Sequence, residues 1–207
     1  MEDQWLQWAK RLQAIASTGL HFGAADYDKE RYAEVADIAQ LMLAALGDVP
    51  LRSIQGLVPD FAQGYATPKV DVRGAVFEGE RILLVQERTD GLWTLPGGYA
   101  DVGLSAAENV VKEIHEEAGI EVRARQLYAV RHKAKHGYRP DTRDFYKFFF
   151  ICEQMNDSYP QPGTETMAAD FFAQDELPSL STGRIIAEDV AAAFRHRNDP
   201  RRLTVFD

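Results

Sequence analysis

The chain has 207 residues, 45% hydrophobic and 27% charged, values typical of one large or two small globular domains. Its 32 acidic residues outnumber 23 lysines and arginines, and the net charge of −9 argues against a general nucleic-acid-binding protein, which needs a basic surface. No apolar run approaches the roughly 18 residues that span a bilayer, and the single cysteine, Cys152, cannot form an internal disulfide. We therefore expect a cytoplasmic protein.

The N-terminal segment is predicted to form two helices. A second periodic run begins at Tyr32 and ends at Gly47, and Gly19 and Gly23 are expected to bracket the break before it. Residues 47–68 are rich in proline and glycine and predict a linker. We thus expect a helical domain with its linker over residues 1–66 and a second domain over 67–207. Apolar residues spaced three and four apart lie on one face of the first helix: Trp5, Trp8, Leu12 and Ile15.

The remainder of the chain predicts an α+β domain. A hairpin is expected from the aliphatic runs at 70–77 and 82–85. Ser105 and Glu108 have the spacing of a capping box, and Gly119 suits a C-terminal cap, so a helix is expected between them. This order of elements predicts a mixed sheet sandwiched by helices. Further strands are expected at 126–131 and 145–152, and a further helix at 184–196.

Three carboxylates stand on one face of the predicted helix that follows Ser105. Glu113, Glu116 and Glu117 are three and four residues apart, so their side chains emerge together and repel each other unless cations neutralise them. Hard divalent ions such as Mg²⁺ prefer carboxylate oxygens. The alternative is a solvated face, which is the usual explanation of a glutamate cluster taken alone. The paired glycines Gly97 and Gly98, before a capped helix, favour a metal site.

This stretch resembles the signature of the Nudix hydrolases, G-x5-E-x7-R-E-U-x-E-E-x-G-U, where U is aliphatic. Two of its fixed positions differ, with Leu104 in place of glutamate and Lys112 in place of arginine. We interpret these departures as the loss of a supporting pair rather than of metal binding. Seven of the nine fixed positions match, at Gly98, Glu113, Ile114, Glu116, Glu117, Gly119 and Ile120.

The resemblance implies a Nudix-type fold and a metal-dependent pyrophosphohydrolase. Its Mg²⁺ or Mn²⁺ would be held by the three helix carboxylates and a backbone carbonyl of Gly97 or Gly98. The expected catalytic residues are Glu116 and Glu117, with Glu117 as a candidate general base. Glu165, on a loop after a strand, is the second candidate, and an ordinary exposed loop glutamate is the alternative.

Basic and aromatic residues are expected to hold the substrate. Arg73 lies in an otherwise apolar strand, where an unpaired charge is costly, so it either forms a salt bridge or contacts a ligand. Tyr99 is a candidate for stacking on a base. The other candidates are Arg88, at the end of the next predicted strand, and the group Arg131, Lys133 and His136, for which a solvated loop is the alternative.

The helical extension and residues 64–74 resemble a bacterial subgroup that includes CDP-choline pyrophosphatases and ADP-ribose pyrophosphatases. We therefore expect hydrolysis of CDP-choline to CMP and phosphocholine, with Tyr99, Tyr128 and Tyr138 as aromatic groups for the choline cation. The alternatives are an ADP-ribose pyrophosphatase, a catalytically weak nucleotide-binding module, suggested by the two departures, and an enzyme acting on RNA ends, which the net charge disfavours.

A homodimer is expected, with the N-terminal helices contributing to its interface. The alternative is that the stripe containing Trp5 and Trp8 packs on the chain's own second helix.

Overall fold

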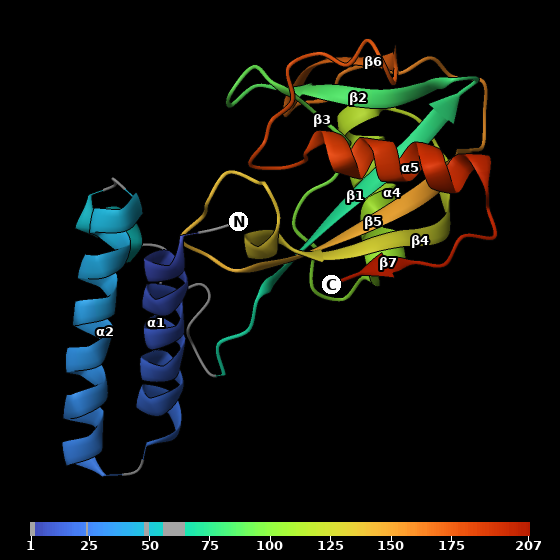
Figure 1. The fold of residues 1–207 in the computed structure, drawn as a ribbon. Coiled ribbons are helices and arrows are strands. Elements are labelled where there is room, and N and C mark those ends of the chain that lie inside the picture. The colour runs from blue at the N-terminus through green and yellow to red at the C-terminus, as the bar shows by residue number, and fades with distance from the viewer. Residues whose placement is uncertain (1–2, 24, 48–49, 56–64) are drawn as a thin grey trace. The chain divides into compact units, whose positions relative to one another are not determined.

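The structure, a computed structural model, describes residues 3–23, 25–47, 50–55 and 65–207. The chain forms two compact units (Figure 1). The first lies within residues 1–69 and also includes 134–145, and the second comprises 70–133 and 146–207. The division at residue 66 stays a prediction, and segment 134–145, expected in the second domain, groups with the first unit. None of the helices described is both long and apolar enough to span a membrane.

The first unit is built on two helices, α1 (Gln4–Phe22) and α2 (Asp26–Gly47). The Asp3 side chain caps α1 by accepting a hydrogen bond from the Trp5 N–H at 2.8 Å. Of the two glycines predicted to bracket the break, Gly23 does follow the last residue of α1, but Gly19 lies within the helix, which continues to Phe22. Gly19 instead allows close packing of the two helices, since a Cβ there would lie 2.5 Å from the Tyr32 ring.

A further short helix, at residues 51–55, completes the core of the first unit. Its Ile54 is buried among Leu6, Ala9 and Leu43, so the prediction of a linker over 47–68 is wrong for this turn. The rest of that prediction includes 48–49 and 56–64, which lie outside the described residues.

Segment 134–145 is tied to α1 by Lys10. The ammonium of this buried lysine lies 3.3 Å from the Asp144 carboxylate and donates to the carbonyl oxygens of Arg143, at 3.1 Å, and Asp141, at 3.4 Å. A lysine in an apolar helix interface is tolerated because its charge is paired in this way.

The strands of the described chain form one seven-stranded sheet in the order β3-β2-β1-β5-β4-β7, with β6 paired to β2 (Figure 1). The predicted hairpin is confirmed, with Phe77 opposite Ile82. Strand β7 runs parallel to β4, which makes the sheet mixed, as predicted. The strands are β1 (Lys69–Glu78), β2 (Arg81–Glu87), β3 (Trp93–Thr94), β4 (Val122–His132), β5 (Phe145–Gln154), β6 (Thr166–Ala173) and β7 (Val205–Phe206), and a short 3₁₀ turn, η1 (Lys133–Lys135), follows β4.

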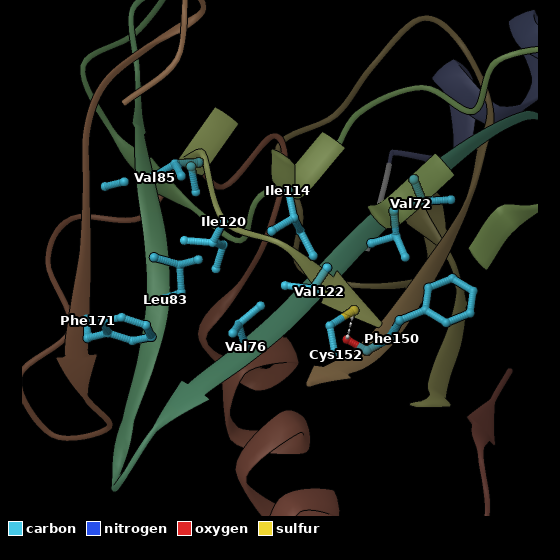
Figure 2. Packing of buried hydrophobic residues seen from close by; sticks show 13 residues of the cluster. Val72, Val76, Leu83, Val85, Ile114, Ile120, Val122, Phe150, Cys152 and Phe171 are labelled. Carbon is cyan, nitrogen blue, oxygen red and sulfur yellow. Dashed lines mark hydrogen bonds between the residues drawn. The ribbon is translucent and has the colours of Figure 1, made fainter. Parts of the chain in front are cut away.

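Two helices cover opposite faces of this sheet, α4 (Ala106–Ala118) and α5 (Ala187–Asn198). Alternate residues of β1 face each layer, because successive side chains of a strand point to opposite sides. Val72 and Val76 belong to the core beneath α4, which Figure 2 shows with Ile114 from that helix, and Ala75 belongs to the core beneath α5. The apolar residues of β1 therefore contribute to the cores on both faces of the sheet.

Helix α4 has the predicted ends and packs very closely on β1. Both hydrogen bonds of the capping box between Ser105 and Glu108 are present, and Gly119 adopts the left-handed conformation at φ 66°. A Cβ on Gly74 would lie 2.4 Å from Cδ1 of Ile114, so the small residue lets the helix approach the strand.

Candidate active site

The glycine loop between β3 and α4 lies along β1. The Val72 N–H donates to the Gly98 carbonyl at 2.8 Å, and the Gly74 N–H donates to the Pro96 carbonyl at 2.9 Å. Gly97 has φ 142°, and a Cβ there would lie 2.0 Å from the Val72 carbonyl oxygen. A side chain at Gly97 is excluded by both backbone conformation and space, which explains the predicted importance of this glycine.

Two of the three predicted carboxylates meet this loop. Glu117, only 6% exposed, accepts a hydrogen bond from the Gly97 N–H at 2.9 Å. The Glu113 carboxylate lies beside Gly98, where a Cβ would be 3.0 Å from either of its oxygens. The structure thus brings together Gly97, Gly98, Glu113 and Glu117, whereas Glu116 is exposed on the outer side of the helix.

Burial makes both carboxylates reluctant to ionise. It raises the pKa of Glu117 to about 7, although the charge of Arg73 and the hydrogen bond from Gly97 act in the opposite direction. Burial also raises the pKa of Glu113, and the negative charges of Glu116 and Glu165 add to this effect. A cation bound beside them would favour the ionised form of both carboxylates and lower these pKa values.

Glu165 and Arg88, both predicted from the sequence, lie on the adjoining loops. The Arg88 N–H donates to the Glu165 carbonyl at 3.2 Å, and the Arg88 guanidinium donates to the Thr164 carbonyl at 2.8 Å. Glu165 is exposed, and its charge raises the pKa of Glu87 as well as that of Glu113. The structure therefore places the second candidate base near the helix carboxylates.

Glu87, a fourth carboxylate of the site, was missed by sequence reasoning. It is a buried residue at the end of β2, burial raises its pKa, and its charge contributes to the raised pKa of Glu117. Arg184 lies 2.9 Å from it and also pairs with Asp90 at 2.8 Å. A carboxylate that ends an apolar strand just before Arg88 was the available signal.

Arg73 forms the salt bridge that was one of its two predicted alternatives. Its guanidinium is bidentate to Asp71, at 2.9 and 3.1 Å, and also donates to the Leu95 carbonyl at 3.1 Å, immediately before the glycine loop. Lys147 is a second partner of Asp71. Burial alone would raise the pKa of Asp71, but the charges of Arg73 and Lys147 lower it. Contact between Arg73 and a substrate stays a prediction.

The remaining predicted binding residues lie in different surroundings. Arg131 is buried and pairs with Asp189 of α5 at 3.2 Å. Tyr99 is 48% exposed and forms an isolated backbone bridge with Asp71. Lys133 is the buried first residue of η1, and His136 belongs to the first unit, where its ring contacts Tyr138.

One aromatic candidate for the choline cation is excluded. Tyr128 is completely buried, and its hydroxyl donates to the Asp189 carbonyl at 3.2 Å. Because it belongs to the core beneath α5, the expectation that Tyr128 faces a ligand is wrong.

The two departures from the signature do not remove ion pairing at this helix. Lys112 lies 2.7 Å from Glu116 and 3.3 Å from Asp101, while Leu104 is exposed. Leu104 carries no charge, so the signature's pair between positions 104 and 112 is absent, and Lys112 pairs instead with Glu116 and Asp101.

The carboxylate chemistry fits a divalent cation. Among the residues that the structure describes, no three histidine, cysteine, aspartate or glutamate side chains are already grouped as a metal site. Glu113 and Glu117 nevertheless converge on the glycine loop with raised pKa values, as expected of ligands whose charge a cation would balance.

Two family models match the chain. The model described as "NUDIX domain" matches residues 67–194, and the model described as "UDP-X-like, N-terminal oligomerisation domain" matches residues 3–58. The chain belongs to the Nudix hydrolase family. This confirms the family membership that the signature predicts. It also confirms the expectation of an enzyme of the Nudix pyrophosphatase class.

Relatives match over most or all of the chain. The putative ADP-ribose pyrophosphatase YjhB from Bacillus subtilis is 42% identical over 207 residues, which are 100% of this chain and 99% of the relative. A crystal structure of a UDP-X diphosphatase is 32% identical with a TM-score of 0.63, and covers 98% of each chain. The structure of an ADP-ribose pyrophosphatase from Streptococcus suis is 42% identical with a TM-score of 0.62, and covers 68% of this chain and 100% of its own.

The raised pKa of Glu117 predicts a pH-dependent stability for the metal-free protein. The folded pKa of about 7 exceeds the ordinary 4.5, so the protonated carboxyl favours the folded state. This contribution is fully present below about pH 4.5 and is lost as the pH rises through about 7, by on the order of 3 kcal/mol. Urea denaturation in EDTA should show Glu117→Gln gaining stability over the wild type across this range.

Glu116→Gln removes an exposed carboxylate from the same helix, together with its ion pair to Lys112, and controls for the loss of a carboxylate that is not buried. A difference in the free energy of unfolding between wild type and Glu117→Gln that does not change with pH would contradict the prediction.

Proposed function

We propose that this protein hydrolyses the pyrophosphate bond of a nucleoside diphosphate linked to a second moiety. The observation that carries the proposal is the convergence of Glu113 and Glu117 on the Gly97–Gly98 loop, because it combines buried carboxylates with a close backbone approach. The family membership and the names of the matching relatives support the same reaction class.

In this proposal Glu113, Glu116 and Glu117 hold Mg²⁺ or Mn²⁺, with a carbonyl oxygen of Gly97 or Gly98. The bound ions would draw charge from the phosphate oxygens and lower the pKa of the attacking water. The Gly97 N–H donates to the Glu117 carboxylate, and the Thr166 hydroxyl donates to the Glu117 backbone carbonyl, so both parts of the residue are held.

A general base must accept the proton of the attacking water within hydrogen-bonding reach. Glu117 is one candidate, because its carboxylate lies against the glycine loop at the end of α4. Glu165 is the alternative, since it is exposed beside the helix carboxylates and free of the hydrogen bond that fixes Glu117. Arg88 and Arg184 lie on the neighbouring loops and are candidates to hold substrate phosphates.

Removal of either negative charge from the end of α4 should abolish most turnover. Glu116→Gln and Glu117→Gln should each lower kcat by more than about 100-fold, because an amide keeps the shape but lacks the charge that holds a divalent ion. Turnover at saturating Mg²⁺, with circular dichroism as a check of folding, measures the effect. Near-normal activity of both variants would contradict the assignment of these residues.

Two substrates compete within the proposed class. CDP-choline follows from the helical extension, and among the aromatic candidates Tyr99 remains exposed to meet its cation. ADP-ribose is favoured by the names of the relatives, and one matching structure is named for UDP-linked compounds. We propose CDP-choline as the preferred substrate, and ADP-ribose is the alternative.

The ratio of kcat/KM values decides between them, because discrimination between substrates is that ratio. We expect CDP-choline to give CMP and phosphocholine faster than ADP-ribose gives AMP and ribose phosphate. The panel should include UDP-linked sugars, with products identified by chromatography. A tenfold or larger preference for ADP-ribose would overturn the CDP-choline proposal and leave the reaction class intact. No cleavage of any compound would favour a nucleotide-binding module.

We also propose a homodimer that uses the outer face of α1. Trp5 and Ile15 are 58% and 56% exposed, and Trp8 and Leu12 are exposed beside them. A different face of α1, which contains Leu6, packs within the unit. Helix α2 therefore does not cover the stripe that contains Trp5 and Ile15. The matching N-terminal model, described as an oligomerisation domain, supports this use.

Light scattering at micromolar concentration should give the mass of a dimer for the wild type. Trp5→Glu combined with Ile15→Glu should shift it to the monomer, because two charges would be buried in the contact. Leu203→Glu, at an exposed apolar residue near the C-terminus, is the matched control. A monomeric wild type would refute the proposal.

A further inference from the structure

Lys112 of α4 lies between two carboxylates that belong to different elements. Its ammonium is 2.7 Å from Glu116, one turn later on the helix, and 3.3 Å from Asp101 in the loop after the glycine pair. One lysine therefore links the outermost of the proposed metal ligands to the loop that precedes the helix.

The position of Asp101 does not depend on Lys112. The Asp101 N–H donates to the side-chain oxygen of Asn109 at 2.8 Å, and the Asn109 amide donates to the Asp101 carbonyl at 3.3 Å. Asn109 is fully buried in α4 and also donates to the carbonyls of Leu104 and Ser105, at 3.3 and 3.1 Å. The loop thus presents the Asp101 carboxylate to Lys112 whether or not the lysine also contacts Glu116.

We propose that Asp101 is a positioning residue that retains Lys112 when Glu116 turns to a divalent cation, and thereby strengthens cation binding. The inference rests on the proposed function, in which Glu116 is a metal ligand. A Glu116 oxygen that accepts a hydrogen bond from the ammonium is occupied, and the nearby positive charge repels a cation. When Glu116 leaves Lys112 for the cation, the lysine still has Asp101 as a partner. Without Asp101, Glu116 is the lysine's remaining partner of the two, and the lysine competes more strongly with the cation for it.

The exposure of the three side chains sets the size of the effect. Lys112 is 37% exposed, Asp101 58% and Glu116 53%, so each ion pair is weak and can exchange readily. Solvent-exposed pairs of this kind contribute little, and we expect changes in cation affinity of about two- to fivefold.

The test is a double-mutant cycle read by Mn²⁺ binding to the full chain in calorimetry, without substrate. Asp101→Asn should weaken Mn²⁺ binding about two- to fivefold, and Lys112→Met should strengthen it by a similar factor. In the Lys112→Met background, Asp101→Asn should change the affinity by less than about 1.5-fold, because the lysine through which Asp101 acts is gone. Glu121→Gln, at an exposed carboxylate soon after α4, controls for the loss of one negative charge.

Equal weakening by Asp101→Asn in both backgrounds would show a general charge effect and overturn the inference. No weakening by Asp101→Asn in the wild-type background would also overturn it. In both cases Mn²⁺ binding that Glu117→Gln abolishes would leave the proposed metal site standing. If the wild type binds no Mn²⁺, or binds it equally well after Glu117→Gln, the proposed metal site is wrong. This inference is then wrong as well.

Discussion

The burial of the Glu117 carboxylate against the Gly97 backbone is the contact around which the second unit is arranged. It requires the glycine loop to lie on β1 without a side chain at Gly97, and it requires the end of α4 to be held from the opposite side. The Thr166 hydroxyl donates to the Glu117 carbonyl at 2.9 Å, and a Cβ on Gly163 would lie 1.8 Å from the Glu116 carbonyl oxygen. The C-terminus of α4 therefore packs between two loops, and neither Gly97 nor Gly163 can be replaced by a larger residue without a clash.

A second constraint is the balance of charge in the interior of the sheet. Asp71, Arg73 and Lys147 are buried together, and each would be costly alone. Their pairing leaves Arg73 with a positive field that reaches both Glu113 and Glu117 and opposes the effect of burial on their pKa values. The same arginine is bonded to the Leu95 carbonyl, so structural support of the loop and electrostatic tuning of the carboxylates come from one side chain.

Local chemistry explains which features could be predicted. The capping box at Ser105 and the carboxylates of α4 are encoded within a few residues of each other, and the hairpin register follows from adjacent runs. Glu87 is brought to the site by the pairing of strands distant in sequence, which no local pattern indicates. The same holds for the ion pair of Lys147 with Asp71, whose partners are 76 residues apart in sequence. Gly19 lies within α1 although glycine usually interrupts a helix, and nothing near it in the sequence indicates that Tyr32 packs against it.

The assignment of segment 134–145 to the first unit has a consequence for the order in which the chain acquires structure. Domains commonly fold as units during synthesis, starting from the N-terminus. Here the buried Lys10 ammonium on α1 pairs with Asp144, a residue that is translated only after about two-thirds of the chain. Completion of the first unit is therefore coupled to the strands that flank the segment, β4 and β5.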